Sequence, residues 1–430
     1  MTRLLAIACL SVVSFVVGSC EPNPGSSSSR TPTVLVFKHG KLSGDPQAFQ
    51  ALLKEFETQH PGLVVREEIL PASTDQQHQY YVMNLEGRTP TFDLLAADVI
   101  WVPEFARAGW IQSLDQLLPA TDRKEFFPAT LQAATFEGRP YAIPWHLDVG
   151  VLYYRRDLLE RYGFAPPGTW ADLVRIARMI LEGERNPGLK GFVWQGKQYE
   201  GLLCVALEFI WGNGAELLVR DTEGKAEAAL AFMRDLIRQG TSPALVATAD
   251  EEAARHLFQA GRAVFMRNWS YAWSLLQRED SPVRDKVGLA PLPSFPKHPS
   301  ASVLGGWMLA VPRGAARPTE AQELIRFLTS SSMQRRMALQ LGYNPVRRRL
   351  YEDPELEKAQ PWLTALYPVV RTARPRLVTP YYLMVSQVLQ PEVSAVVVGR
   401  RSAKAALASA RRQIYQILGL QEDHSRPSFP

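Results

Sequence analysis

The sequence is poor in cysteine, in net charge and in long hydrophobic runs, and each shortage excludes a class of protein. Only 3 of its 430 residues are cysteines, which excludes a disulfide framework. The 48 basic and 43 acidic residues leave a formal charge of +5, too small to favour a nucleic-acid partner. The 46% hydrophobic and 21% charged residues are those of an ordinary globular protein, not of a disordered chain or a membrane protein with several spans.

Motifs for metal, nucleotide and nucleophilic chemistry are also missing. The 7 histidines show no HExxH or similar spacing, no two cysteines form a CxxC pair, and no GxSxG nucleophile turn occurs. Gly191–Gln198 comes close to a phosphate-binding loop, but Gln198 stands where that motif needs a magnesium-binding Ser or Thr. We therefore expect no metal and no cofactor.

The first twenty residues predict export. Leu4–Val17 is an apolar run of 14 residues, too short to cross a bilayer core of ~30 Å and typical of a signal peptide. The following Gly18-Ser19-Cys20 resembles the bacterial lipobox, and that resemblance implies that residues 1–19 are removed and Cys20 is lipidated. An ordinary secretory signal is the alternative.

A short tether and one buried thiol complete this part of the analysis. Residues 20–33 carry no large apolar side chain and predict a flexible tether. We expect a body anchored by lipid to a bacterial membrane, facing the periplasm or the cell exterior. The remaining cysteine, Cys204, lies in an apolar run and is predicted to be a core residue.

Strands alternate with helices along the body of the chain. Apolar runs predict strands at Val34–Phe37, Leu63–Leu70, Phe92–Ala97, Pro140–Tyr154, Arg262–Met266 and Val303–Val311. Apolar spacing and capping residues predict helices after Asp45-Pro46 and at Thr74–Glu86, Trp170–Glu182, Tyr199–Trp211, Lys225–Gln239, Asp250–Ala260, Pro318–Thr329, Ser332–Leu341, Pro354–Leu366, Tyr382–Val398 and Ala403–Leu418. This order predicts an α/β fold with a largely parallel sheet.

The length of the chain predicts two domains. Crossovers near Pro144–Val149 and Pro312–Pro318 would make both of them discontinuous, with a ligand cleft between them. The expected lobes are 34–145 plus about 312–350, and 146–311 plus about 351–420. We expect a frayed tail at 421–430.

Carboxylates and tryptophans stand beside apolar strands. Asp98 ends one apolar run, and Asp148 lies between two apolar segments. A carboxylate there is costly unless it is hydrogen-bonded, and sugar hydroxyls would satisfy it. The 10 tryptophans offer flat faces for the C–H face of a pyranose. Structural alternatives stay open, because Asp98 could cap the next helix and Gly305-Gly306 could relieve a tight bend.

Several segments together resemble the solute-binding proteins of ABC sugar importers, specifically their trehalose/maltose-binding branch. The segments that carry the resemblance are Asp98–Trp101, Leu152–Leu159, Gly191–Cys204, Arg267–Trp273, Gly288–Pro296, Leu304–Trp307 and Pro380–Tyr382. The resemblance implies a two-lobed, periplasmic-binding-protein-like α/β fold with a hinge. It also implies a monomeric, non-enzymatic receptor for an α-linked gluco-disaccharide such as trehalose or maltose, which docks on two permease subunits served by a cytoplasmic ATPase.

The same resemblance implies a set of ligand-binding residues. They are Asp98, His146, Asp148, Trp269, Gly305, Gly306, Trp307 and Arg376. The two carboxylates and the arginine would bind hydroxyls, the tryptophans would stack on the sugar, and the glycines would let it approach the backbone. The spacing also allows Arg374 in place of Arg376.

Three departures from the family pattern keep other ligands open. His146 stands where the family often has Tyr, the basic stretch Lys38–Lys41 follows the first strand where a Glu is usual, and Gln79-Tyr80 replaces an Arg. Asp45 is the nearest substitute for the missing Glu. The alternatives are a glucosylated compatible solute or an acidic sugar derivative. An alternative from another class is a secreted glycoside hydrolase with Asp98 and Asp148 as its carboxylate pair.

Overall fold

The computed structural model describes residues 32–71, 73–87, 90–217 and 219–419. The predicted signal peptide, the lipidation site Cys20, almost all of the tether and the predicted tail 421–430 lie outside these residues. Within the described ranges, no helix combines the length and apolar character that crossing a membrane requires.

One mixed sheet runs through the molecule in the order β2-β1-β3-β10-β6-β8-β7, with β9 also paired to β6. The strands are β1 Thr33–Gly40, β2 Leu63–Leu70, β3 Leu94–Asp98, β4 Thr135–Phe136, β5 Arg139–Pro140, β6 Ile143–Arg155, β7 Lys190–Val193, β8 Ala263–Trp269, β9 Val287–Ala290 and β10 Leu304–Ala310. Strands β1, β2 and β3 pair in parallel, whereas β10 is antiparallel to both β3 and β6. Strand β6 is also antiparallel to β8 and β9, so the prediction of a largely parallel sheet was wrong. The short β4 and β5 form a separate hairpin.

The sheet is covered by helices of very different length. The α-helices are α1 Pro46–Gln59, α2 Thr74–Glu86, α3 Val102–Arg107, α4 Ala120–Arg123, α5 Pro128–Ala133, α6 Arg156–Arg161, α7 Trp170–Glu184, α8 Glu200–Gly212, α9 Glu223–Arg238, α10 Glu251–Gln259, α11 Ala272–Leu276, α12 Pro318–Thr329, α13 Ser331–Leu341, α14 Pro354–Ala359, α15 Trp362–Thr372, α16 Tyr382–Val397 and α17 Ala403–Leu418. Short 3-10 helices lie at Asp115–Leu117, Arg220–Thr222, Ala244–Thr248 and Arg348–Glu352.

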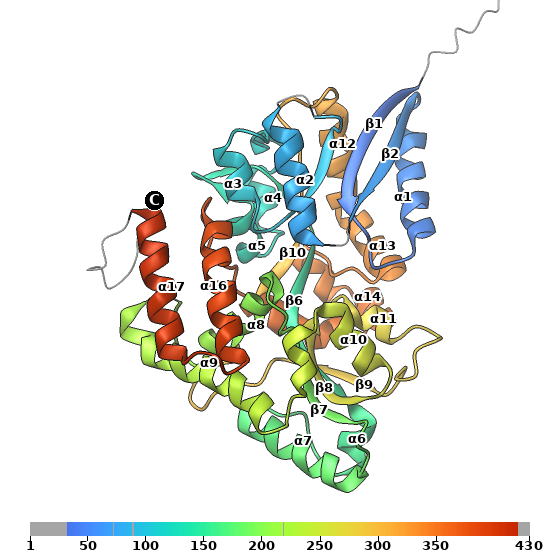
Figure 1. The fold of residues 1–430 in the computed structure, drawn as a ribbon. Helices are drawn as coiled ribbons and strands as arrows, with labels where there is room; N and C mark the ends of the chain where they lie inside the picture. The colour runs from blue at the N-terminus through green and yellow to red at the C-terminus, as the bar shows by residue number, and fades with distance from the viewer. Residues whose placement is uncertain (1–31, 72, 88–89, 218, 420–430) are drawn as a thin grey trace, which may run out of the picture.

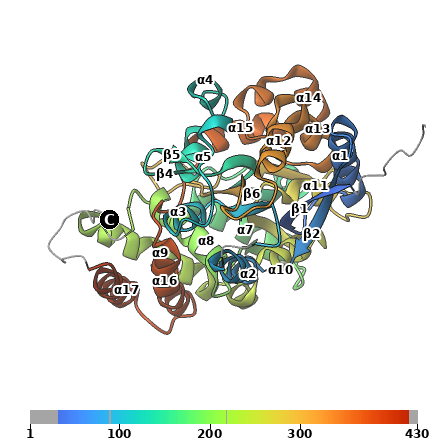
Figure 2. The same ribbon diagram turned by 90° about the horizontal axis from the view of Figure 1, so that it is seen from above.

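Strand β6 connects two halves of the molecule. Its first part pairs with β10 as far as Val149, and from Gly150 onward it pairs with β8. Figure 1 shows β1–β3 with α1, α2 and α3 in the upper half, β7–β9 with α6 and α7 in the lower half, and β6 running between them. Helices α16 and α17 lie side by side next to α8 and α9 in both Figure 1 and Figure 2.

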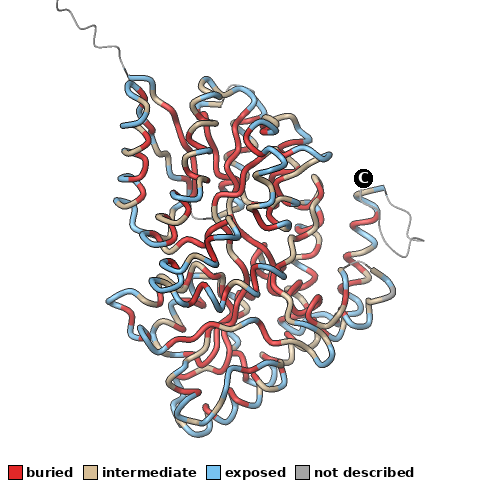
Figure 3. The backbone as a smooth tube through the Cα atoms, turned by 180° about the vertical axis from the view of Figure 1, so that it is seen from behind, coloured by how far each residue is buried: buried red, intermediate tan, exposed pale blue. Residues whose placement is uncertain are grey.

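The core follows the sheet through both halves. In Figure 3 the buried backbone runs along the central strands, while exposed residues lie on the outer turns of the helices. The predicted core thiol Cys204 is buried on α8. One charged pair also lies in this interior, because Arg267 and Glu208 are both almost fully buried and bind each other.

Helix beginnings were predicted well because their signals are local. Asp45, Thr169 and Asp250 each accept a hydrogen bond from a backbone N–H in the first turn of α1, α7 and α10. The bounds of α2, α12 and α17 are those predicted. Strands β7 and β9 were not predicted.

Three predicted elements need correction. The helix predicted over 354–366 is two helices, α14 and α15, which break before Pro361 because proline has no N–H for a continuing helix. The strand predicted at 92–97 is displaced and includes Asp98. Strand β1 continues to Gly40, so most of the Lys38–Lys41 stretch lies in the sheet rather than in a loop.

Candidate functional site

The candidate site forms around β10 at the centre of the sheet. Trp307 of β10 lies opposite Asp98 of β3 on one side and opposite His146 of β6 on the other. Two residues earlier, Gly305 lies opposite Asp148. The strand order therefore brings both predicted carboxylates and one predicted tryptophan together from three separate parts of the chain.

The glycine pair brings the second tryptophan to the same place. A Cβ atom on Gly305 would lie 3.0 Å from Cζ3 of Trp269, so the indole ring packs against this glycine. Gly306 has φ +126°, and a Cβ there would lie 2.4 Å from the carbonyl oxygen of His146. Glycine is required at Gly306 by its backbone conformation, and at Gly305 it leaves room for the ring of Trp269.

Partial exposure singles out these side chains from their strands. In β3 only Asp98 is partly exposed, in β8 only Trp269, and in β10 only Trp307, while the other residues of these strands are buried. In β6 the partly exposed residues before its last two positions are His146 and Asp148. Partly open polar and aromatic groups among buried neighbours are typical of a ligand site.

Arg376 is the arginine that reaches Asp98. Its Nη2 donates to Oδ1 of Asp98 at 3.1 Å, and its Nη1 donates to Oε1 of Glu200 at 2.8 Å. Arg374, the other arginine that the spacing allows, instead pairs with Glu216 at 2.7 Å on a more exposed part of the surface. The geometry therefore favours Arg376 as the site residue.

Asp98 is not the cap of the following helix. Its Oδ1 accepts the N–H of Ile100 at 3.1 Å and closes a tight turn, whereas α3 begins later, at Val102, without a side-chain cap. This alternative for Asp98 was wrong because the chain makes a turn of its own before the helix. Oδ1 of Asp98 thus binds both this turn and Arg376.

Asp148 is held by neutral donors. Its Oδ1 accepts from Oγ of Ser270 at 3.0 Å, from the N–H of Tyr271 at 2.9 Å and from Nδ2 of Asn344 at 3.3 Å. Burial raises the pKa of Asp148 to about 7, against the opposing effect of these hydrogen bonds. No hydrogen bond from the described residues reaches its Oδ2, so this oxygen is free to bind a ligand hydroxyl.

His146 presents a neutral ring to the same region. Burial, with a smaller effect of nearby His39, lowers the pKa of His146 to about 3. The ring stacks on Tyr343 with centroids 4.6 Å apart and an interplanar angle of 12°. A neutral imidazole offers one donor and one acceptor to a ligand and no positive charge.

Two basic residues after the first strand are paired with carboxylates. Nζ of Lys38 binds Glu68 at 2.5 Å, and Nε2 of His39 binds Glu67 at 3.0 Å, both across the parallel pairing of β1 with β2. Lys41, at the end of the stretch, is exposed, so the alternative of an acidic sugar stays a prediction. Asp45 is an exposed helix cap and takes no part in the site, and Tyr80 packs against Nζ of Lys38.

Two groups that the sequence did not single out fix Trp269. The guanidinium of Arg267 lies 4.3 Å from the centre of the indole ring and is itself held by Glu208, at 2.8 and 2.5 Å, and by Oε1 of Gln195. On the ring edge, Nε1 of Trp269 donates to Oε1 of Glu251 at 3.2 Å. These residues lie in or near recognised motifs, but their pairing joins distant segments.

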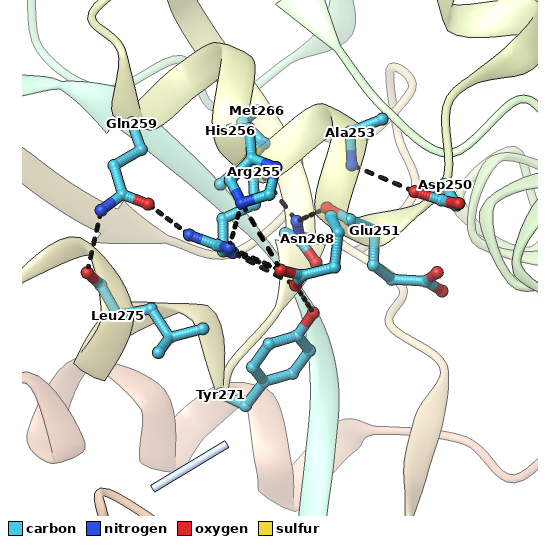
Figure 4. Close-up of polar contacts among 11 residues, drawn as sticks. Asp250, Glu251, Ala253, Arg255, His256, Gln259, Met266, Asn268, Tyr271 and Leu275 are labelled. Atoms are coloured by element: carbon cyan, nitrogen blue, oxygen red, sulfur yellow. Dashed lines mark hydrogen bonds and ion pairs between the residues drawn. The ribbon is translucent and has the colours of Figure 1, made fainter. Parts of the chain in front are cut away.

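Helix α10 is bound to residues next to Trp269, and Figure 4 shows these polar contacts. Nδ2 of Asn268 donates to the backbone oxygen of Glu251 at 3.0 Å. The phenol of Tyr271 donates to Glu252 at 2.9 Å, next to the guanidinium of Arg255. Because the N–H of Tyr271 binds Asp148, this contact also anchors the donor of a predicted ligand-binding carboxylate.

The segment that resembles a phosphate-binding loop has another role. The N–H groups of Gly196 and Lys197 both donate to the carbonyl of Ala249 at 3.1 Å, and Nε1 of Trp194 donates to Ser242. Backbone donors used in this way cannot cradle a phosphate. Among the described residues, no group of three or more His, Cys, Asp or Glu side chains is arranged to hold a metal ion.

Comparisons with known proteins identify the family of the chain. Residues 40–335 match the family described as bacterial extracellular solute-binding protein. A probable ABC transporter-binding protein of Deinococcus radiodurans is 40% identical over 364 residues, which cover 81% of this chain and 86% of that protein. The maltotriose-binding protein of Pyrococcus abyssi is 24% identical over 331 residues, covering 75% and 68%.

Solved structures share the two-lobed, periplasmic-binding-protein-like α/β fold. Maltose-bound MalE3 of T. maritima has a TM-score of 0.84 and 37% identity, covering 90% of this chain and all of that one. A solute-binding protein of Thermotoga lettingae with bound α-D-tagatose has a TM-score of 0.79 at 23% identity, covering 90% and 99%. The second likeness concerns the fold alone.

Proposed function

The chain belongs to the bacterial extracellular solute-binding proteins, a family of substrate-binding receptors of ABC importers, and we propose that its solute is an α-linked gluco-disaccharide such as maltose or trehalose. The observation that carries the proposal is the register of β10, which gathers Asp98, Asp148, Trp269 and Trp307 around Gly305-Gly306. The similarity to a maltose-bound protein and to a maltotriose-binding protein supports a glucose-containing ligand.

Each group has a defined task in this proposal. Asp98 and Asp148 accept hydrogen bonds from sugar hydroxyls, and Arg376 donates a hydrogen bond to a sugar oxygen. The rings of Trp269 and Trp307 cover the C–H faces of the two sugar units. His146 sets the selectivity at one end of the ligand, because a buried polar group left unpaired discriminates strongly between ligands. No covalent step is involved.

Capture works by hinge closure. One proposed lobe comprises residues 34–145 and about 312–350, and the other comprises residues 146–311 and about 351–420. Strand β6 forms part of the connection between them. A sugar that contacts both lobes stabilises the closed form by its difference in affinity between the closed and open states. The closed monomer then docks on two permease subunits powered by a cytoplasmic ATPase.

The export of the receptor is part of the same proposal. Residues 1–19 act as signal peptide and Cys20 carries the lipid that holds the body at the membrane, outside the cytoplasm. Globomycin, which blocks lipoprotein signal peptidase, should leave the precursor uncleaved. Normal processing in its presence would leave an exported receptor without a lipid anchor.

The ligand is tested by titration calorimetry of the mature protein with maltose, trehalose, glucosylglycerate, mannitol, ribitol and tagatose. Maltose or trehalose should bind with the highest affinity, and Trp307→Ala should weaken binding at least ~tenfold without changing the thermal transition by more than a few degrees. Tight binding of glucosylglycerate instead would favour the compatible-solute alternative. Release of glucose during the incubation would favour the hydrolase.

A further inference from the structure

A cavity of about 240 Å³, which is separate from the candidate sugar site, is lined in part by Arg376. It is bounded by α8, by α16 and by the segment 374–378, and Figures 1 and 2 show these two helices next to each other. Its walls are largely aliphatic and come mainly from Leu203, Leu207, Ile210, Val385, Leu389 and Val393. These six side chains are all buried, so the cavity is an apolar space within the packed interior of the molecule.

Arg376 joins this cavity to the candidate sugar site. Its two Nη groups are occupied by Asp98 and Glu200, and the side chain is only 3% exposed. Its Nε is buried and finds no hydrogen-bond partner among the residues that the structure describes. An unpaired donor on a buried cation is costly, and a ligand oxygen at the border between site and cavity would satisfy it.

The outer end of the cavity is polar. Arg374, which lines it, packs over the ring of Trp211 at 4.4 Å and binds Glu216 at 2.7 Å. Gln132 of α5 also lines the cavity. A neighbouring hollow of about 430 Å³ shares Gln132, Arg374 and Pro375 with this cavity and leaves room for a longer substituent.

We propose that this cavity binds the apolar aglycone of a glycoside, an aryl or short alkyl group, whose sugar occupies the site at Asp98. The unpaired N–H of Arg376 then donates to the glycosidic oxygen or an adjacent hydroxyl. A dry apolar cavity of ~150 Å³ accommodates benzene, so this larger space is sufficient for a phenyl ring. The inference rests on the proposed function, because the sugar half of the ligand binds there.

The test compares phenyl and methyl glycosides of glucose and maltose, as both anomers, by calorimetry on the full mature protein. Burial of the ring should make at least one phenyl glycoside bind ~tenfold or more tightly than its methyl counterpart. Ala206→Leu on α8 fills the cavity without touching Arg376. It should abolish the gain from the phenyl group and leave the affinity for unsubstituted maltose unchanged.

A second variant keeps the test valid if Ala206→Leu does not fold. Val378→Trp narrows the cavity from a partly exposed loop and should have the same effect as Ala206→Leu. Its matched control, Val398→Trp at the exposed end of α16, should retain the gain.

The outcomes separate the two proposals. If maltose binds but the phenyl and methyl glycosides have equal affinities, the cavity assignment is wrong and the sugar receptor stands. A phenyl gain that survives both cavity variants overturns the assignment as well, since the aglycone then lies elsewhere. If neither maltose, trehalose nor any glycoside binds, both proposals fall.

Discussion

Asp98 and Asp148 flank the same strand but are held in opposite ways. Asp98 binds the guanidinium of Arg376, whereas Asp148 is bound by a hydroxyl, an amide side chain and a backbone N–H. The first carboxylate therefore faces a cation in this structure, and the second keeps its charge only against the cost of burial. One side of the site is thus an ion pair, and the other responds to pH.

Removing the countercharge should have the largest effect. Arg376→Ala leaves Asp98 and Glu200 without their cation, and breaking a buried pair costs ~3–5 kcal/mol of stability. Maltose affinity should fall at least ~100-fold. Arg374→Ala is the matched control, because its exposed pair with Glu216 contributes ~1 kcal/mol or less. Equal losses in the two variants, by urea unfolding and calorimetry, would contradict the assignment of Arg376.

Asp148 and His146 should give opposite responses of stability to pH. Because the folded pKa of Asp148, about 7, lies above its unfolded one, the contribution of Asp148 is fully present below about pH 4 and is lost as pH rises through 7. His146, with a folded pKa of about 3, makes the protein less stable as pH falls below its unfolded pKa of 6.5, so the comparison of the parent with Asp148→Asn isolates the part due to Asp148. Asp148→Asn should remove this loss, which amounts to roughly 2–4 kcal/mol. Urea unfolding at pH 5 and pH 8, without ligand, measures it.

Binding should show the opposite trend with pH. A sugar hydroxyl that donates to the ionised form of Asp148 should bind up to ~tenfold more weakly at pH 6 than at pH 8. This trend should persist in Asp98→Asn and vanish in Asp148→Asn. Its persistence in Asp148→Asn would assign the titration to another group.

Substitutions at Gly305 and Gly306 should separate an effect on ligand binding from an effect on protein stability. Gly306→Ala forces a residue with φ +126° against a backbone oxygen and should destabilise the protein by ~2 kcal/mol or more. Gly305→Ala instead displaces the ring of Trp269, so it should weaken maltose binding several-fold at a smaller cost in stability. The comparison fails if Gly305→Ala binds maltose as the parent does.

The smallest effect should come from the contact on the indole edge. Glu251→Ala removes the hydrogen bond to Nε1 of Trp269, which contributes ~0.5–1.5 kcal/mol, so affinity should fall ~2- to 10-fold. It also removes the hydrogen bond from the hydroxyl of Tyr199, whose loss should lower stability. In the background Trp269→Phe, which lacks that N–H, the same substitution should have no further effect on affinity. A double-mutant cycle measures this coupling.

The parts that sequence could predict are those with local causes. Asp45, Thr169 and Asp250 cap helices whose first turns lie within three residues of them, so their roles follow from adjacent sequence. The pairing of Lys38 and His39 was missed because their acidic partners lie on another strand.

The site itself depends on contacts between distant segments. Trp307 reaches Asp98 only because β10 enters the sheet between β3 and β6, an arrangement that no local pattern encodes. The resemblance to a family supplied the residues, and Arg376 was distinguished from Arg374 only by position in the fold. Glu200 and Glu251 were missed because their partners, Arg376 and Trp269, are remote in sequence.

Strand β6 changes its pairing partner next to Asp148, so Asp98 and Asp148 should contribute differently to ligand binding and to closure. Asp148 stands directly before the point where β6 leaves β10 for β8, so it lies on the axis about which the lobes of the proposal would turn. A group on the axis moves little and contacts the sugar similarly in the open and closed forms. Asp98 and Arg376 belong to different lobes of the proposal, so their ion pair joins the lobes and would change on closing. Asp148 would then determine the affinity of the open form for sugar. The ion pair of Asp98 with Arg376 would determine the equilibrium between the open and closed forms.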